Sequence, residues 1–435
     1  MNELFLQRMQ ELIPDEMDDF LKSFENPLKK GLSLNTKKCT KENFEAFTDL
    51  KWEQSPFHAN GCIVQDSLGN HPGHICGAFY LQEPSASAPV SALDIQGDEK
   101  VVDLCAAPGG KSMQIATQLD TGFLLSNEIN ANRAQVLLSN MERMGFDHVA
   151  VSNSSVQDIA KSYAHCFDKV LVDAPCSGEG MMHKHQEAMD QWSLDLVLEC
   201  QARQKEILQS AYQCLVEGGI LVYSTCTYAK EENEEVVQWF LDTFDDMELV
   251  PIKANFGREG LISGTIRIFP MDQGEGQFMA KFKKKGQGQS LLKERKSDSL
   301  SKEASSFISQ QVSGDYYYAS YQDKVWMKRS PFYELKKIKV LRQGIYVGQE
   351  KKKRFEPAHH FYMAADFPFL KKVDVTIDNM NAFMHGLEIQ HEAQKGYVAL
   401  CYKGLPFGFG KASGNTIKNK IPKGLRLLEK SKIQK

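Results

Sequence analysis

The fold of this chain is decided by the stretch Val101-Val102-Asp103-Leu104-Cys105-Ala106-Ala107-Pro108-Gly109-Gly110-Lys111-Ser112. Two valines open a short apolar run, which breaks into small residues, a proline and two glycines. A helical pattern resumes at Lys111. This order is typical of a strand, a tight turn and a helix N-terminus, which is where an α/β sheet meets a nucleotide-like ligand.

Beyond that stretch, predicted strands and helices alternate along the chain. The predicted strands lie at 123–128, 149–153, 169–173 and 220–224, and the helices at 131–144, 194–215 and 231–244. Two further apolar runs, at 267–269 and 278–282, are expected to close the sheet as antiparallel strands. Alternation of this kind predicts an α/β fold with a doubly wound, mostly parallel sheet.

Length and composition restrict the class of protein. A chain of 435 residues is too long for one ordinary domain, and we expect three or four. A content of 42% hydrophobic and 25% charged residues is typical of a soluble globular protein. No basic leader with an apolar core opens the sequence, and no uncharged run is long enough to span a bilayer, so no membrane partner is expected. The ten cysteines are scattered without a C-x-x-C pair, which favours a reducing, cytoplasmic location.

Charge is distributed very unevenly along the chain. Residues 281–435 hold 31 Lys and Arg against 14 Asp and Glu, a net charge of +17, whereas residues 1–280 carry a net −21. A basic module joined to an acidic, ligand-binding one favours a polyanionic partner such as nucleic acid over a merely segregated solvated surface.

The first 75 residues are predicted to form a small mixed α/β unit. Apolar residues recur at helical spacing from Phe5 and again after Pro14, and a short alternating strand follows at 32–34. The nearby residues Cys62, His71, His74 and Cys76 suggest a zinc site. Their spacing matches no standard pair of ligand knuckles, so roles in the core or in loops are the better interpretation.

The end of the chain is predicted to be a linker followed by strand-rich domains. Residues from 283 to about 306 are rich in Lys, Gly, Gln and Ser. Short apolar runs follow, for example at 325–327 and 345–347, while 351–354 and the tail from Lys411 carry much of the positive charge. Aromatic residues interleaved with lysines on a small β domain fit RNA binding.

The glycine turn itself excludes two common ligand motifs. Gly109-Gly110-Lys111-Ser112 resembles the end of a phosphate-binding P-loop, but Cys105 occupies the position where that motif needs its first glycine. The G-x-G-x-x-G pattern of dinucleotide sites is also absent. Glu128 ends the next strand, where a carboxylate can accept both hydroxyls of a ribose. A ribose without a phosphate cradle suggests S-adenosyl-L-methionine.

Two cysteines follow neighbouring strands of the predicted sheet. One lies in Asp173-Ala174-Pro175-Cys176-Ser177-Gly178-Glu179-Gly180 and the other in Ser224-Thr225-Cys226-Thr227-Tyr228. A single cysteine at such a place is usually packing. Two of them beside Asp173 favour chemistry, because a thiolate that adds to C6 of a pyrimidine makes C5 nucleophilic toward a methyl donor. An acid near N3, for which Asp173 is placed, would stabilise the adduct, and a base must later remove the C5 proton.

These motifs together resemble the Nop/Sun family of RNA (cytosine-5)-methyltransferases, most closely its bacterial RsmF-like ribosomal RNA enzymes. The resemblance covers most of the chain. Besides the glycine turn and the two cysteine motifs, it includes Gln82-Glu83-Pro84-Ser85, Asn130-x-x-Arg133-Ala134 and Lys418-Asn419-x-x-Pro422-Lys423-Gly424-Leu425-Arg426.

The resemblance implies a role for each matching residue. Cys226 would be the nucleophile and Cys176 would assist release, although DNA cytosine methyltransferases use the cysteine that corresponds to Cys176. Lys111 and Asp173 would lie nearest the reacting base. The implied contacts to S-adenosyl-L-methionine are Cys105, Ala106, Ala107, Pro108, Gly109, Gly110, Lys111, Glu128, Arg133 and Asp173. No metal is implied.

The chain departs from the family pattern at two places. Members usually place an Asp after the third strand to hold the adenine amino group, where this chain has Ser155, with Asp158 as the other candidate. The arginine expected after Gly180-Met181 is replaced by Met182-His183, with Lys184 kept, so a substrate contact is expected to differ.

The sequence therefore predicts a Rossmann-like methyltransferase sheet with RNA-binding domains before and after it. The expected domains are an N-terminal α/β RNA-binding domain (1–75), the methyltransferase domain (76–282), a linker (283–310), a β-rich RsmF-like domain (311–372) and a PUA-like RNA-binding domain (373–435). The expected activity is methylation of cytosine C5 by a cytoplasmic monomer, with 16S rRNA or the 30S subunit as substrate. The alternatives are a tRNA methyltransferase, a non-catalytic RNA-binding assembly factor and a P-loop NTPase.

Overall fold

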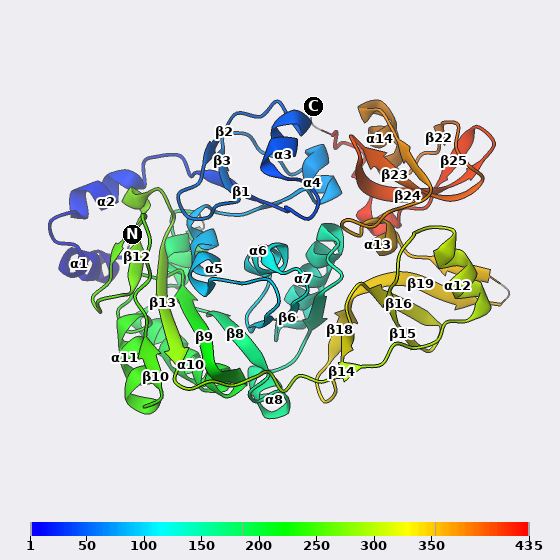
Figure 1. Cartoon of the computed structure of the whole chain (residues 1–435). Helices are drawn as coiled ribbons and strands as arrows, with labels where there is room; N and C mark the ends of the chain where they lie inside the picture. Colours follow the sequence, from blue (N-terminus) through cyan, green and yellow to red (C-terminus); the bar gives the residue numbers. More distant parts are fainter. Residues whose placement is uncertain (1, 185, 353, 434–435) are drawn as a thin grey trace.

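A large twisted sheet forms the centre of the molecule in this computed structural model, which describes residues 2–184, 186–352 and 354–433 (Figure 1). Across the sheet the strands follow the order β11 (Arg258–Glu259), β12 (Ile266–Ile268), β13 (Gln277–Lys284), β9 (Leu215–Thr225), β8 (Phe167–Asp173), β5 (Lys100–Asp103), β6 (Phe123–Asn127), β7 (Val149–Ser152) and β18 (Val340–Gln343), with β10 (Met247–Leu249) paired to β13.

The five strands from β9 to β7 run parallel. The expected antiparallel closure is confirmed, since β13 pairs antiparallel with β9 and β12 pairs antiparallel with β13. The prediction of a doubly wound α/β sheet is confirmed as well. In such a sheet the carboxyl ends of the parallel strands meet at one edge, where ligands bind.

Helices cover both faces of this sheet and bury a separate core on each. Val101 and Val102 point to opposite faces because side chains of a strand alternate. Val101 packs beneath α5 (Ala88–Leu93), α6 (Gly110–Gln118) and α7 (Ala131–Met144). Val102 packs beneath α8 (Val156–Ser162), α10 (Leu194–Cys214) and α11 (Glu234–Thr243). Burial on two faces explains why the strands read as nearly continuous apolar runs.

The N-terminal segment divides between two places. The predicted helices are present as α1 (Glu3–Leu12) and α2 (Met17–Ser23), and they pack against Trp192, Tyr228 and Phe269 of the central region. The rest forms a separate sheet with its own small core. That unit consists of β2 (Trp52–Gln54), β3 (Gly61–Val64), β1 (Lys30–Leu34) and β4 (Phe79–Leu81), with α3 (Lys41–Phe47) and α4 (Pro72–Cys76).

The residues that suggested a zinc site have structural roles. The His71 side chain caps α4, where its Nδ1 accepts the backbone N–H of Gly73 at 3.0 Å. Cys62 and Cys76 are buried in two different hydrophobic cores. The interpretation as core and loop residues accounts for these contacts.

Two small sheets lie at the C-terminal end of the molecule (Figure 1). The first contains β15 (Tyr317–Tyr321), β16 (Lys324–Lys328), β19 (Ile345–Lys351) and β20 (Arg354–Pro357). The second contains β21 (Lys372–Asp374), β23 (Gly396–Tyr402), β24 (Leu405–Ser413), β25 (Thr416–Asn419) and β22 (Ile389–Gln390). Helices α13 (His359–Tyr362) and α14 (Ile377–Met384) accompany them.

The predicted linker and the segment after it contain secondary structure and strand pairings that the sequence does not predict. Residues 283–310 contain strand β14 (Glu294–Arg295), which pairs with β17 (Phe332–Tyr333), and helix α12 (Lys302–Ser309), which buries Ala304 and Ile308. Strand β18 belongs to the C-terminal segment by sequence, but it pairs antiparallel with β7 and so forms one edge of the central sheet. The methyltransferase sheet therefore includes residues from outside 76–282.

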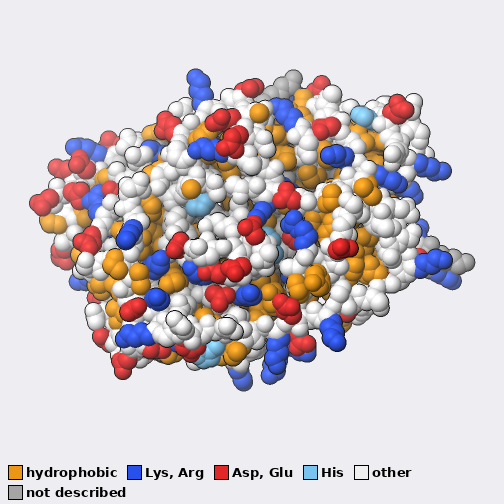
Figure 2. Space-filling model, viewed as in Figure 1, with side chains coloured by type: hydrophobic (Ala, Val, Ile, Leu, Met, Phe, Trp, Pro, Cys, Tyr) orange, Lys and Arg blue, Asp and Glu red, His pale blue; other side chains and the backbone are white. Residues whose placement is uncertain are grey.

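The uneven charge of the sequence is visible on the molecular surface. Figure 2 shows Lys and Arg side chains gathered over the C-terminal sheets and acidic side chains over α1 and α2 at the other end. Along the described residues, no helix has both the length and the apolar character needed to cross a bilayer.

Candidate active site

The glycine turn links β5 to α6 at the carboxyl edge of the sheet. Gly109 has a φ of +118°, a value that a residue with a Cβ rarely adopts, and it precedes the first residue of α6. The backbone N–H of Ala106 donates to the carbonyl of Asn127 at 2.8 Å, which fixes the turn against β6. The start of α6 is thus held open toward the edge where β5 and β6 end.

Asp103, at the end of β5, is fully buried beneath this turn. Its Oδ2 accepts the Ser112 hydroxyl at 2.7 Å, while its Oδ1 has no partner within the described part of the chain. Burial raises the pKa of the Asp103 carboxyl to about 7. Burial also raises the pKa of the neighbouring Cys105 thiol, which favours its neutral form.

Glu128 lies directly after β6, and its carboxylate is buried in the same corner. It accepts the backbone N–H of Asn130 at 2.8 Å and faces the Arg133 guanidinium at 3.5 Å. Arg133 in turn donates to the carbonyl of Ala107 at 2.8 Å, which ties α7 to the glycine turn. These contacts therefore hold Glu128, Arg133 and the glycine turn next to one another.

Ser155 and Asp158 form one local unit at the start of α8. The Ser155 hydroxyl caps the helix by accepting the backbone N–H of Asp158 at 3.1 Å, and it donates to the Asp158 carboxylate at 2.7 Å. The two candidates for the adenine contact are thus hydrogen-bonded to each other. Both lie after β7, the strand next to β6.

Asp173 ends β8 and is the centre of a polar cluster. Its Oδ2 accepts from the Lys111 ammonium at 2.8 Å, and its Oδ1 accepts from the Ser224 hydroxyl at 2.7 Å and from Gln277 at 3.5 Å. Burial lowers the pKa of Lys111, but the Asp173 carboxylate more than offsets this effect, so the net shift is upward. The two side chains therefore form a charged pair beside the cysteines.

Cys176 and Cys226 meet although they are 50 residues apart in the sequence. Their sulfur atoms lie 3.2 Å apart, and the backbone N–H of Cys226 donates to the Cys176 sulfur at 3.4 Å. The contact with Cys226 and burial hold the pKa of the Cys176 thiol well above its usual range. Cys176 is therefore kept as a neutral thiol, which can donate a proton.

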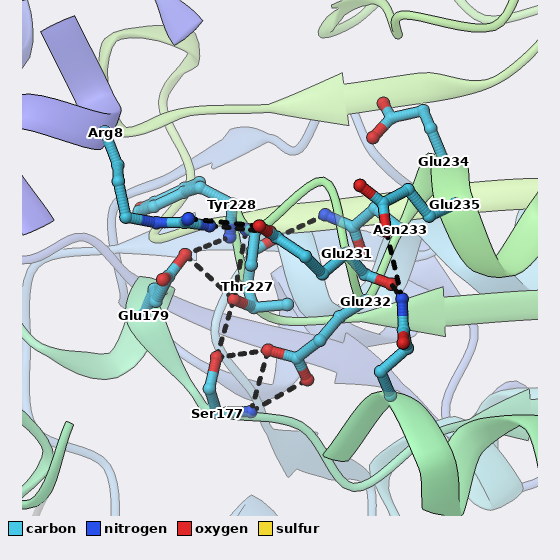
Figure 3. A network of polar contacts seen from close by, with 12 residues as sticks. Arg8, Ser177, Glu179, Thr227, Tyr228, Glu231, Glu232, Asn233, Glu234 and Glu235 are labelled. Atoms are coloured by element: carbon cyan, nitrogen blue, oxygen red, sulfur yellow. Dashed lines mark hydrogen bonds and ion pairs between the residues drawn. The ribbon is translucent and has the colours of Figure 1, made fainter. Parts of the chain in front are cut away.

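Behind the cysteines lies a network of buried polar side chains (Figure 3). Ser177 and Thr227, each directly after a cysteine, are 2.9 Å apart at their hydroxyl oxygens. Glu232 accepts from the backbone N–H of Ser177 at 3.0 Å, and Glu179, in the turn η2 (Glu179–Met181), accepts from the Thr227 hydroxyl at 2.9 Å. The network also reaches α1, where Arg8 forms a bidentate pair with Glu231.

Sequence reasoning missed several of these residues. The acids at 231–235 follow a strand and precede a helix, and this pattern predicts only an interaction with the helix dipole. Glu234 does lie in the first turn of α11, but it is buried in an ion pair with Arg267, and Glu232 is fully buried. Glu179 and Gln277 carried no signal of their own. Glu179 lies close to Cys176 in the sequence, and Gln277 is the first residue of β13. Nothing else about these two residues indicated that they belong to the site.

Comparison with protein families gives matches along nearly the whole chain. The profile of "16S rRNA methyltransferase RsmB/F" matches residues 90–283. Three further profiles match the N-terminal domain of 16S rRNA methyltransferase RsmF at 1–84, the first C-terminal domain of RsmF rRNA methyltransferase at 306–364, and the methyltransferase RsmF PUA domain at 370–427.

Individual proteins are similar over the same length. The ribosomal RNA small subunit methyltransferase F of Vibrio vulnificus is 33% identical, and that of Citrobacter koseri is 30% identical; 97% of this chain is covered in both, with 97% and 95% of the relatives. Among solved structures, a methyltransferase homolog protein from Pyrococcus horikoshii is 30% identical with a TM-score of 0.57, over 65% of this chain and 95% of that one. NSun6 from Pyrococcus horikoshii, at 19% identity and a TM-score of 0.60, covers 66% of this chain and 99% of its own and shares the fold.

Proposed function

The chain belongs to the RsmF family of 16S rRNA methyltransferases, and on that premise we propose that it methylates C5 of a cytosine in 16S rRNA through a covalent bond between Cys226 and C6 of the base. The observation that carries the proposal is the contact of Cys226 with Cys176 at 3.2 Å, at the ends of two neighbouring parallel strands. The charged pair of Lys111 and Asp173 lies beside them and supplies the polar groups that the base requires.

The corner between β5, β6 and α6 fits S-adenosyl-L-methionine. A ribose needs a carboxylate such as that of Glu128, and the methionine part needs backbone and polar groups near the glycine turn, where Asp103 keeps an unpartnered Oδ1 among the described residues. Arg133 holds the turn in place, and Ser155 or Asp158 is the candidate contact for adenine. When bound, S-adenosyl-L-methionine supplies the methyl group.

Each remaining step uses side chains of this site. The Cys226 thiolate attacks C6 of cytosine, a new sulfur–carbon bond forms, and the charge that develops on the base is neutralised at N3. Since Asp173 is paired with Lys111, we infer that the pair, rather than Asp173 alone, provides that proton. After C5 has gained the methyl group, a base removes the C5 proton, the Cys226–C6 bond breaks with its electron pair leaving on the Cys226 sulfur, and the N3 proton returns to the Lys111–Asp173 pair. Cys176 lies where it can exchange a proton during this release.

The basic C-terminal domains are proposed to hold the RNA. Residues 82–280 hold 13 Lys and Arg against 30 Asp and Glu, a net −17, and would repel phosphate groups, whereas residues 281–435 carry a net +17. The domain division expected from the sequence remains part of this proposal, with the N-terminal sheet as a further RNA contact. Because the proposed substrate is ribosomal RNA, we propose the cytoplasm as the place of action and a monomer as the active form.

Methyl transfer to defined RNAs tests the function. Purified protein with labelled S-adenosyl-L-methionine is expected to methylate 16S rRNA, as free RNA or in the 30S subunit, and to leave tRNA unlabelled. Bisulfite sequencing of rRNA from a deletion strain is expected to lose one or more 5-methylcytosines, which the wild-type gene restores. Transfer to tRNA alone, or to no RNA, would refute the proposed substrate.

A further inference from the structure

A continuous chain of oxygen atoms runs behind the two cysteines (Figure 3). It begins at Oε1 of Glu232, which contacts the Ser177 hydroxyl at very short range, and continues from Ser177 to the Thr227 hydroxyl at 2.9 Å. It ends at Oε2 of Glu179, which is 2.9 Å from Thr227. The chain thus links the residue after Cys176 to the residue after Cys226.

The hydrogen bonds between these oxygen atoms require more protons than would be present if both Glu179 and Glu232 were ionised. Three oxygen–oxygen contacts need three protons, one in each hydrogen bond. The hydroxyls of Ser177 and Thr227 supply two of them. The third must come from a carboxylic acid at one end, so Glu179 and Glu232 together carry one negative charge. Burial raises the pKa of both carboxyls, that of Glu232 to about 7.

The partners of the two carboxyls decide which of them keeps the proton. Both oxygens of Glu179 accept from groups that can only donate, namely the Trp192 indole N–H at 2.8 Å and the backbone N–H of Tyr228 at 2.9 Å. A proton on Oε1 of Glu179 would face the Trp192 donor, and a proton on Oε2, which could point toward Thr227, would leave a poorer acceptor for the Tyr228 N–H at 2.9 Å. Arg8 also favours the charged form of Glu179 electrostatically.

Of the two Glu232 oxygens, Oε1 has the weaker contact with a group that can only donate, since the Ser177 backbone nitrogen lies 3.3 Å from Oε1 and 3.0 Å from Oε2. Its Oε2 accepts from Ser177 N–H at 3.0 Å and from the Gln204 amide at 2.7 Å. The same amide nitrogen donates to the carbonyl of Pro175 at 3.1 Å, which fixes its orientation. The close partner of Oε1 is the Ser177 hydroxyl, which can accept as well as donate.

We propose that Glu232 is a positioning residue that acts as a neutral carboxylic acid: it donates to Ser177, Ser177 donates to Thr227, and Thr227 donates to the carboxylate of Glu179. This arrangement sets the separation of Cys176 and Cys226. It also leaves a single negative charge behind the position where the Cys226 thiolate forms. The inference rests on the proposed function, since it assigns a role in the same reaction.

The surroundings of Glu232 give the direction of its pH dependence. The titratable groups that interact with it are Glu179 in η2, Cys176 after β8, Cys200 in α10 and Tyr223 in β9, and none of these four carries a positive charge. Since the pKa is raised in the folded state, the stabilisation is complete below the ordinary glutamate pKa and is lost as the pH rises through about 7.

The test compares the same substitution, glutamate to glutamine, at Glu232 and at Glu179, the two ends of the hydrogen-bonded chain of oxygen atoms. In Glu232→Gln the amide oxygen can accept from Ser177 N–H and Gln204 while the amide nitrogen donates to the Ser177 hydroxyl, so only the longer contact of Ser177 N–H with Oε1, at 3.3 Å, is lost. In Glu179→Gln the amide nitrogen must face Trp192 or Tyr228, both donors. Glu232→Ala removes the donor altogether.

We expect Glu232→Ala and Glu179→Gln to lose kcat by at least about tenfold with cofactor affinity kept, and Glu232→Gln to restore transfer. The kcat ratio of Glu232→Gln to wild type is expected to rise at least about threefold between about pH 6 and about pH 8. Without substrate, the infrared spectrum of the wild type is expected to contain the carbonyl band of a buried protonated carboxyl that Glu232→Gln lacks.

The two kinds of measurement separate the possible failures. Infrared spectra and unfolding temperatures against pH need no methyl transfer, so they test the protonated Glu232 even if the substrate is wrong. Absence of the band, equal pH profiles, or a Glu232→Gln variant as damaged as Glu179→Gln would each overturn the inference.

Discussion

The sulfur atoms of Cys176 and Cys226 lie 3.2 Å apart, and the pKa of the Cys176 thiol is held well above its usual range. Two thiols at this separation cannot both ionise easily, because like charges at close range repel. A site with one protonated and one reactive thiol separates attack from release. The two cysteines are therefore expected to behave differently when removed.

Cys226→Ala is expected to abolish methyl transfer, by at least about 10³-fold, as for other covalent nucleophiles. Cys176→Ala is expected instead to accumulate protein joined to RNA, because attack proceeds and release fails. Denaturing gels with labelled RNA measure both. The matched control is Cys166→Ala, a buried cysteine at the far end of β8 whose sulfur donates to the carbonyl of Ala164. Trapping by Cys226→Ala instead would exchange the two assignments.

Breaking the charged pair of Lys111 and Asp173 is expected to slow the chemical step. Asp173→Asn keeps the shape of the site but removes the charge that raises the pKa of Lys111, so kcat should fall by about 10²–10³-fold with little change in cofactor affinity. Single-turnover transfer and calorimetric titration measure the two quantities. Because the family resemblance also implies a cofactor contact for both residues, a joint fall of kcat and cofactor affinity would assign the pair to cofactor binding instead of the chemical step.

Glu128→Gln is expected to weaken cofactor binding by at least about tenfold, because an amide accepts less strongly than a carboxylate from paired hydroxyls. Titration with S-adenosylhomocysteine gives the affinity directly. Gln135→Ala, an exposed change in helix α7, which follows Glu128 in the sequence, is the control. Unchanged affinity in Glu128→Gln would place the ribose elsewhere.

Removing three exposed charges near the C-terminus is expected to weaken RNA binding uniformly. Lys418→Gln, Lys420→Gln and Lys423→Gln together should reduce the slope of log affinity against log salt by about 0.7–0.9 for each phosphate group that the variant no longer neutralises. Filter binding at several salt concentrations measures this slope. Lys253→Gln, an exposed lysine of the acidic half, should leave both affinity and slope unchanged.

The contact between Arg329 and Asp147 is expected to stabilise the junction of the central sheet with the C-terminal region. Asp147 is buried, and Arg329 donates to it at 2.8 Å and 3.1 Å from its side chain. Arg329→Met should cost about 2–3 kcal/mol of unfolding free energy. Urea unfolding measures the change, and Lys336→Met, which breaks an exposed pair, should cost almost nothing.

That junction also has a predictable pH dependence. Burial raises the pKa of Asp147, but His148 and Arg329 lower it more strongly, so the pKa lies well below its usual range. A carboxyl with a depressed folded pKa stabilises the protein above its unfolded pKa, and the contribution is lost as the pH falls below that value. The wild type should therefore lose its advantage over Arg329→Met in acid.

The central sheet could be predicted because each of its strands carries the signal of its own environment. Val101 and Val102 are buried on opposite faces, so the centre of the strand is apolar on both sides, and the positive φ of the turn requires a glycine at position 109. The cysteine motifs end neighbouring strands, and this alone predicts that Cys176 and Cys226 share one edge of the sheet.

Other features could not be predicted because their cause lies far away in the sequence. Nothing in the four residues of β18 indicates that they pair with β7. Glu232 resembles a surface acid, and only the folded chain supplies Ser177 and Gln204 as its partners. The segment 283–310 has few apolar residues, yet Ala304 and Ile308 are enough to bury one face of helix α12.

The pairing of β18 with β7 has a consequence for how the protein folds during its synthesis. A ribosome makes β7 long before residues 340–343, so the nascent chain carries an open sheet edge with unpaired backbone groups while the 187 residues between the two strands are made. The sheet that positions Cys176 and Cys226 is completed only after the first basic segment of the C-terminal region has begun to emerge. Chains that end before residue 340 would thus lack both the strand that pairs with β7 and the basic region proposed to bind RNA. Such fragments are expected to aggregate or to be degraded.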